Sequence, residues 1–145
     1  METPKIPMNV IEIQKLIPHR YPFLFVDRVI ELVPHEKIVA IRNVTISDPM
    51  LQGHFPNNPI VPGVVLVEGA AQAATLLGSV SKGGCQACLF TEISNARFRK
   101  PVVPGDVIHY NVTLKRTKSH FFWFEASLTV DGEQAVEVEF SAMMK

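Results

Sequence analysis

The chain carries a strand pattern over most of its length. Residues 24–33 and 37–46 are rich in Val and Ile and are separated by Pro34-His35-Glu36, which predicts a hairpin. The same pattern recurs in four later segments separated by turn signals, namely residues 86–99, 107–118, 121–130 and 133–144. Asp131-Gly132 is a typical hairpin turn. Because the turns are short, we expect an antiparallel sheet of five or six strands.

Helical spacing predicts one short helix, residues 10–17, and one long helix, residues 64–81. The long helix follows Pro62 and Gly63 and ends before Gly83-Gly84. It is apolar nearly all round, so it should be covered on most of its faces. A curved antiparallel sheet wrapped around such a helix is the hot dog fold, an α+β architecture, which we therefore predict.

The composition excludes a disordered, collagen-like or coiled-coil chain. The 145 residues suit a single domain spanning residues 1–145, and the 47% hydrophobic fraction is typical of a folded globular protein. Fourteen basic residues balance fourteen acidic ones, so the overall charge gives no reason to expect a nucleic-acid or membrane partner.

The apolar segment 60–80 is long enough to span a membrane, but Pro62, Glu68 and Gln72 interrupt it. A carboxylate at mid-membrane costs about 2.5–3.5 kcal/mol on insertion scales. We therefore expect a buried core helix. The first nine residues contain no apolar run, so we predict no signal peptide and a cytoplasmic location.

The sequence predicts no metal and no cofactor. Cys85 and Cys88 lack histidines at zinc-site spacing and precede an extended segment, so we interpret them as ordinary buried thiols. The chain contains no phosphate-binding loop or dinucleotide motif. Ser79 and Ser81 lack the glycine context of a nucleophile elbow.

Glu68 is the only ionisable residue between His54 and Lys82. A carboxyl among apolar neighbours should hold its proton more tightly than usual, which suits a general acid. Glu68 also belongs to a polar stripe on one helix face, which continues with Gln72, Thr75 and Ser79. The alternative interpretation is a solvent-facing or hydrogen-bonded stripe without catalytic function.

His54 lies in the proline-rich loop, residues 47–62, that leads into the same helix. An imidazole is the usual base near neutral pH, although a single loop histidine is often structural. A base and a buried acid fourteen residues apart form a more specific pair than either residue alone.

Four segments then carry a resemblance to a known family: PHRYPFLFVDRV (18–29), RNVT (42–45), QGHFPNNPIVPGVVLVEGAAQ (52–72) and ARFRKPVVPGD (96–106). In order and spacing they resemble the (3R)-hydroxyacyl-acyl-carrier-protein dehydratases of bacterial type II fatty acid synthesis, the FabZ type. The resemblance implies a hot dog fold, no metal or cofactor, and homodimers that assemble three at a time into a hexamer. It also implies acyl carrier protein as the partner and allows lipid A precursor supply as a second use.

The resemblance also assigns roles to residues. His54 and Glu68 would dehydrate a (3R)-3-hydroxyacyl thioester to the trans-2-enoyl product, each site combining His54 of one subunit with Glu68 of the other. The N–H of Gly63, at the helix start, is a candidate donor to the thioester carbonyl, or else Gly63 serves turn geometry only. Candidate residues of the acyl tunnel are Phe55, Gln72 and Phe98.

Arg97, Arg99 and Lys100 are candidates for docking an acidic carrier protein, the alternative being an ordinary solvated cationic face. The segment 114–118, LKRTK, is a second candidate. The helix reads EGAAQ where the family more often has EAMAQ, so the smaller Gly69 and Ala71 would widen or reshape the tunnel.

Three rival functions remain open at this stage. A dehydratase-isomerase of the same fold would carry Asp in place of Glu68. A hot dog thioesterase would hydrolyse the thioester rather than dehydrate the acyl chain. An inactive acyl-binding module would need only the tunnel, with no use for His54 or Glu68.

Overall fold

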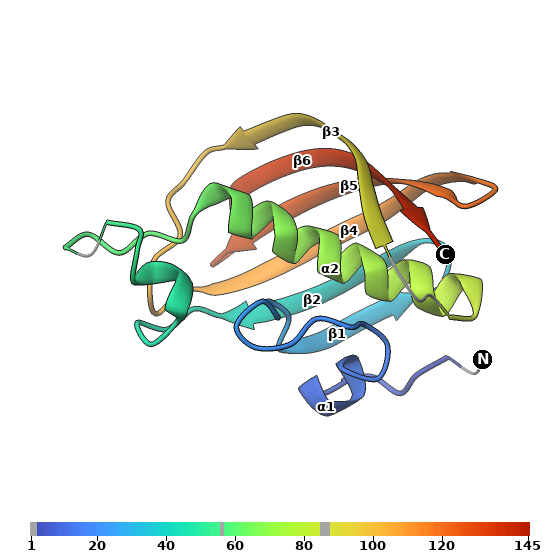
Figure 1. Cartoon of the computed structure of the whole chain (residues 1–145), viewed down its shortest axis with the longest axis horizontal. Helices are drawn as coiled ribbons and strands as arrows, with labels where there is room; N and C mark the ends of the chain where they lie inside the picture. Colours follow the sequence, from blue (N-terminus) through green and yellow to red (C-terminus); the bar gives the residue numbers. More distant parts are fainter. Residues whose placement is uncertain (1–2, 56, 85–87) are drawn as a thin grey trace.

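A long helix, α2 (Gly63–Lys82), lies against one face of a curved sheet (Figure 1). The computed structural model describes residues 3–55, 57–84 and 88–145. Over these residues the sheet has six strands in the order β1-β2-β4-β5-β6-β3, and every neighbouring pair is antiparallel. The strands are β1 (Arg28–Val33), β2 (Lys37–Asn43), β3 (Cys88–Phe98), β4 (Val107–Lys118), β5 (Phe121–Val130) and β6 (Glu133–Met144). The predicted α+β hot dog architecture is confirmed.

The C-terminal strands follow their predicted bounds because apolar and polar positions alternate clearly in this part of the chain. In β5 the buried residues are Phe122, Phe124, Ala126, Leu128 and Val130, whereas the residues between them are exposed or half-buried. The β5–β6 turn has positive φ angles at Asp131 (52°) and Gly132 (77°), as a hairpin of this type requires.

Burial surrounds α2 on nearly every side. Most residues from Val65 to Val80 are buried, including the polar Gln72, Thr75 and Ser79. By length and hydropathy α2 would suffice to cross a membrane, but 83% of its most apolar stretch is buried within the fold. The prediction of a core helix is therefore confirmed.

The first helix is shorter than the predicted residues 10–17. It covers only α1 (Val10–Ile13), which begins with a capping box between Asn9 and Glu12. Beyond it, the Arg20 guanidinium donates hydrogen bonds to the carbonyl oxygens of Gln14 and Ile17, at 2.8 Å each. These carbonyl oxygens find no helical partner, because Pro18 follows and a proline has no N–H to continue the helix.

The first hairpin is also shorter than predicted. Strand β1 begins at Arg28 rather than at residue 24, because residues 23–25 bond to side chains of other elements. Strand β2 ends at Asn43, and the loop that follows contains a short 3-10 helix, η1 (Pro49–Leu51). Cys88 is half-buried at the start of β3, whereas Cys85 lies outside the described residues.

Gly83 ends α2 in the left-handed region, with φ of 84°. A Cβ at this position meets no atom within 4 Å, so Gly83→Ala adds only backbone strain. We expect a loss of about 1–2 kcal/mol in the free energy of unfolding, measured by urea denaturation. Gly53→Ala is the control, because its Cβ also has space and its φ is not positive. Equal losses for both variants would contradict the strain argument.

Candidate active site

The His54 ring is oriented by the loop that contains it. Its Nδ1 lies 2.7 Å from the carbonyl oxygen of Ile60, farther along the same loop. A carbonyl oxygen only accepts hydrogen bonds, so Nδ1 carries a proton, and in the neutral ring Nε2 is then the nitrogen with the lone pair. Phe55, largely exposed, packs its ring against the imidazole at a centroid distance of 4.3 Å. The loop thus prepares His54 to act as a base through Nε2.

A pocket of about 280 Å³ connects His54 with the start of α2. Its lining includes His54, Gly63, Leu66, Phe98 and Val102. As the first residue of α2, Gly63 has an N–H without a partner inside the helix, at the positive end of the helix dipole. A Cβ on Gly63 would lie 2.8 Å from Cε1 of Phe98, so glycine allows this ring to pack over the helix start.

Glu68 lies in a second, larger pocket of about 510 Å³. Every other residue in the lining is apolar: Phe23, Val64, Val65, Val67, Phe90, Ile93, Ala96 and Phe98. Burial raises the pKa of the Glu68 carboxyl, and a hydrogen bond from Gln72 opposes part of this rise. The predicted direction of the pKa shift is confirmed, and a protonated carboxyl is the form that a general acid requires.

In the polar stripe of α2, Glu68 is half-buried, whereas Gln72, Thr75 and Ser79 are buried. Gln72 is fully buried; its Nε2 donates to the carbonyl oxygen of Phe23 and its Oε1 accepts from the N–H of Phe25, each at 2.8 Å. Its Nε2 also lies 3.4 Å from Oε2 of Glu68. Thr75 donates to the carbonyl oxygen of Ala71 at 2.8 Å. Gln72 therefore holds the segment that contains Phe23.

The three candidate tunnel residues lie in different places relative to the pockets. Phe98 lines both pockets, whereas Phe55 and Gln72 line neither. Phe55 accompanies His54, and Gln72 supports Glu68 and Phe23 from within the fold. Phe23 is a pocket residue that sequence reasoning missed, because it lies in an irregular segment without a periodic pattern.

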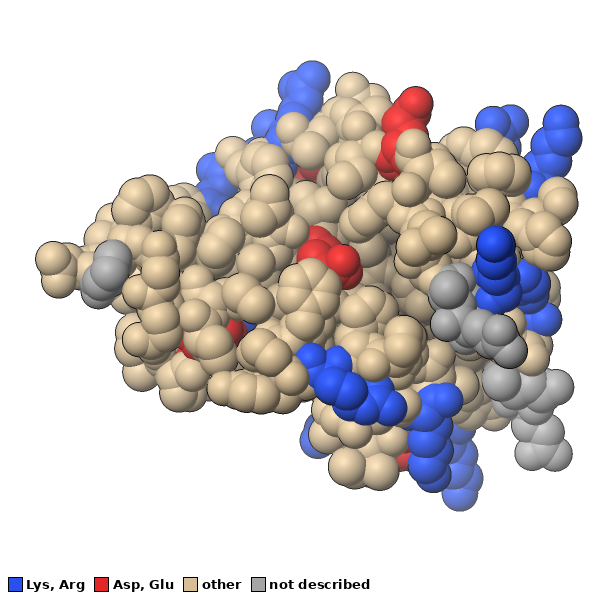
Figure 2. All heavy atoms as spheres, viewed as in Figure 1, with Lys and Arg blue, Asp and Glu red and all other residues tan. Residues whose placement is uncertain are grey.

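Within one subunit His54 and Glu68 do not line the same pocket. His54 belongs to the smaller pocket and Glu68 to the larger, and Phe98 is the residue common to both linings. The surface around the larger pocket is apolar: Val64 is 78% exposed, Phe98 53% and Ile93 48%. On the face drawn in Figure 2, Lys and Arg side chains lie mainly toward the edges, and an acidic group lies near the middle within a largely uncharged surface.

The three candidate docking cations are paired with glutamates of β6. Arg99 lies 2.6 Å and Arg97 3.9 Å from Oε1 of Glu137, and Lys100 lies 2.9 Å from Glu133. The two arginines thus share one glutamate, while Phe98 between them faces the pockets, in agreement with strand alternation. Arg99 and Lys100 also line the His54 pocket.

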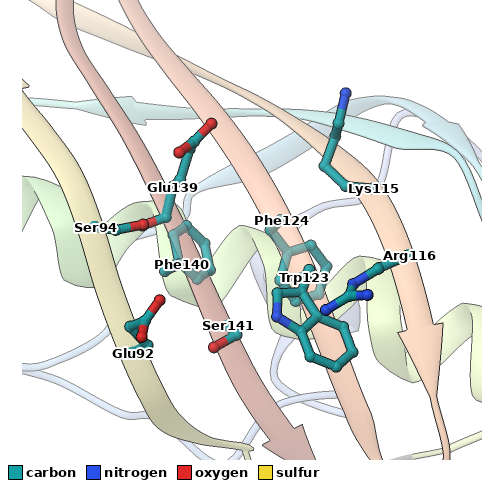
Figure 3. Close-up of a pocket in the computed structure, with 9 residues that line it drawn as sticks. All are labelled: Glu92, Ser94, Lys115, Arg116, Trp123, Phe124, Glu139, Phe140 and Ser141. Carbon is teal, nitrogen blue, oxygen red and sulfur yellow. The ribbon is translucent and has the colours of Figure 1, made fainter.

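The second docking candidate, residues 114–118, lies elsewhere. Lys115 and Arg116 line a separate pocket over β3, β4, β5 and β6, with α2 behind the strands (Figure 3). The guanidinium of Arg116 lies over the Trp123 ring, 4.0 Å from its centroid. Neither His54 nor Glu68 lines this pocket. Over the described parts of the chain, no three His, Cys, Asp or Glu side chains are grouped as metal ligands.

Sequence comparison decides the family. A family model described as the FabA-like domain matches residues 17–139. A 3-hydroxyacyl-[acyl-carrier-protein] dehydratase FabZ of Rickettsia bellii is 43% identical over 95% of this chain and 97% of its own length. The FabZ dehydratase of Aromatoleum aromaticum is 42% identical over 95% and 98%, respectively. The chain belongs to the FabZ dehydratase family.

Solved structures agree with the hot dog fold of this dehydratase family. The dehydratase heterocomplex ApeI:P from Xenorhabdus doucetiae superposes with a TM-score of 0.82 over 98% of this chain and 93% of its own, at 16% identity. A hypothetical thioesterase with coenzyme A from Streptococcus pneumoniae gives a TM-score of 0.64 over 81% and 84%, at 14% identity. At such identities the likeness shows the fold alone.

The raised pKa of Glu68 has a consequence for stability. Between the usual pKa near 4.5 and the raised one, the folded protein binds more protons than the unfolded chain, so stability falls as pH rises. Glu68→Gln removes this cost. We expect the variant to melt above wild type at neutral pH, with the gain disappearing below pH 4.5, as measured by thermal unfolding across pH. A gain that persists unchanged in acid would contradict the assignment.

Proposed function

We propose that the protein dehydrates (3R)-3-hydroxyacyl thioesters carried by acyl carrier protein to trans-2-enoyl thioesters in fatty acid biosynthesis. The observation that carries the proposal is the placement of Glu68, a carboxyl with a raised pKa, in an otherwise apolar pocket. The family's named activity supports the same conclusion. We treat residues 1–145 as one dehydratase domain that needs no metal or cofactor.

In the proposed reaction His54 Nε2 removes a proton from C2, which the thioester carbonyl makes acidic. The C–H electrons form the C2=C3 double bond as the C3–O bond breaks. Glu68 gives its proton to the departing hydroxyl, which leaves as water. The N–H of Gly63 is oriented to stabilise negative charge on the carbonyl oxygen. Proton exchange afterwards returns His54 to its neutral form and Glu68 to its acid form.

We propose further that the site forms between two subunits. Strand β3 lies at the edge of the sheet, so its outer backbone groups are available to pair with a second copy. Its side chains Phe90, Ile93 and Phe98 are exposed apolar residues that line the same pocket as Val64, and Leu89 of the same strand is exposed as well. Covering this surface with a partner would enclose the Glu68 pocket and let His54 come from the other chain. Assembly of three dimers into a hexamer and the cytoplasmic location are proposals from the sequence.

The first test is product analysis by mass spectrometry with 3-hydroxyacyl carrier protein and added chelator. We expect enoyl product, unaffected by the chelator. His54→Ala and Glu68→Gln should each lose about 10²–10⁴-fold in kcat. The matched controls His120→Ala and Glu125→Gln remove exposed groups outside both pockets and should retain activity.

Each rival function predicts another outcome of this assay. Release of free fatty acid would indicate a thioesterase, and a shifted double bond would indicate an isomerase. Substrate binding without any product would indicate an acyl-binding module.

A mixing experiment tests the shared site. His54→Ala and Glu68→Gln are denatured together and refolded, so that about half the dimers are hybrids by random pairing. Each hybrid holds one site with both defects and one with neither, so activity should return to about a quarter of wild type. Verified hybrids without activity would contradict a shared site and leave the two catalytic roles standing.

Carrier docking is tested by replacing Arg97, Arg99 and Lys100 with Ala. We expect a larger loss of kcat/KM with carrier-bound substrate than with a small thioester, and a smaller difference at high salt, because salt screens exposed charges. Lys5, Lys15 and Arg28 replaced by Ala form the control, since this variant removes the same charge from exposed positions outside both candidate docking segments and both pockets. Equal losses on the two substrates would exclude docking.

A further inference from the structure

Gly69, the residue after Glu68, packs directly against Tyr110 of β4. Both residues are buried, and a Cβ built on Gly69 would overlap the Tyr110 hydroxyl and ring. The tyrosine therefore fills the space that a side chain at position 69 would occupy. The small residue at position 69 therefore makes room for Tyr110 and does not widen the tunnel.

The Tyr110 side chain extends past α2, and its hydroxyl reaches the irregular segment before β1. It donates a hydrogen bond to the carbonyl oxygen of Phe25 at 2.9 Å. Burial raises the pKa of Tyr110, so the phenol keeps its proton and remains a donor. The N–H of the same residue, Phe25, donates to Gln72. Side chains from β4 and α2 thus hold Phe25 from two directions.

This segment forms a wall of the Glu68 pocket. Phe23 lines the pocket and contacts the Phe25 ring at a centroid distance of 4.9 Å. Because β1 begins only at Arg28, strand pairing does not position Phe23. Its place depends on the bonds made by Gln72 and Tyr110, together with a turn bond of 2.7 Å from its own N–H to the carbonyl oxygen of Arg20. A substitution at Tyr110 should therefore shift Phe25 and, through it, the Phe23 side chain that lines the pocket.

We propose that the Gly69–Tyr110 pair determines acyl-chain specificity, with Tyr110 acting as a positioning residue that fixes the Phe23 wall of the pocket. The inference rests on the proposed function, because it takes this pocket as the place of the acyl chain. The glycine is required so that the tyrosine hydroxyl can pass the helix next to the catalytic acid.

Tyr110→Phe is the main test, because it keeps the ring and removes the hydrogen bond to Phe25. We compare kcat and KM for short, medium and long 3-hydroxyacyl thioesters. The preference for the best chain length over the poorest should fall about three- to tenfold, the factor expected for one lost hydrogen bond. The change should appear mainly in KM, since His54 and Glu68 are untouched.

Gly69→Ala provides a second route to the same effect. Its methyl group displaces Tyr110, so we expect a flattened chain-length profile together with a lower melting temperature. Gly78→Ala is the matched control, because its Cβ would overlap Met144 at a position about 13.5 Å farther along the helix. It should lower the melting temperature and leave the chain-length profile as in wild type.

Binding of unreactive thioether analogues, carrying the same acyl lengths, is measured in parallel. An unchanged profile in folded Tyr110→Phe would overturn the inference, as would an equal change in Gly78→Ala. If wild type binds the analogues but makes no enoyl product, the proposed function fails, and the binding profiles of the variants still decide the inference.

Discussion

The burial of α2 on nearly all sides is the constraint on which the rest of the structure depends. A helix that is covered this completely cannot leave polar groups without partners, because each would cost free energy in the apolar interior. Gln72 accordingly uses both ends of its amide to hold the segment 23–25, and Thr75 bonds back to the helix. Glu68 is compensated only in part, by a hydrogen bond of 3.4 Å from Gln72. Its carboxyl faces an apolar pocket and has a raised pKa as a direct result.

Close packing of α2 also explains its small residues. Gly63 lets Phe98 pack over the start of the helix, Gly69 admits Tyr110, and Gly78 admits Met144. Large side chains from the sheet fill these positions, so the helix and the sheet approach each other closely. The same contacts place Phe98 between the two pockets and hold Phe23 at the wall of one of them. Packing and site geometry are therefore consequences of one arrangement.

The fold is shared by dehydratases and by a hypothetical thioesterase, so it does not by itself determine the reaction. What distinguishes this chain is the chemistry added to the fold. The loop carbonyl of Ile60 fixes the His54 tautomer, and the first N–H of α2 lies in the same pocket. A glutamate rather than an aspartate occupies the helix position, which argues against an isomerase.

The sequence by itself determined the strand order along the chain, the long helix and the two candidate catalytic residues. These were accessible because alternation, turn residues and a lone carboxyl in an apolar helix are local signals. Only the tertiary structure decided the early end of α1, the late start of β1, the separation of His54 and Glu68 into two pockets, and the packing of Tyr110 against Gly69. The end of α1 involves Arg20, which lies only three to six residues from the carbonyls that it binds. The other features depend on contacts between residues far apart in the chain, such as Tyr110 with Phe25 and Gln72 with Phe23, and no local pattern encodes such pairs.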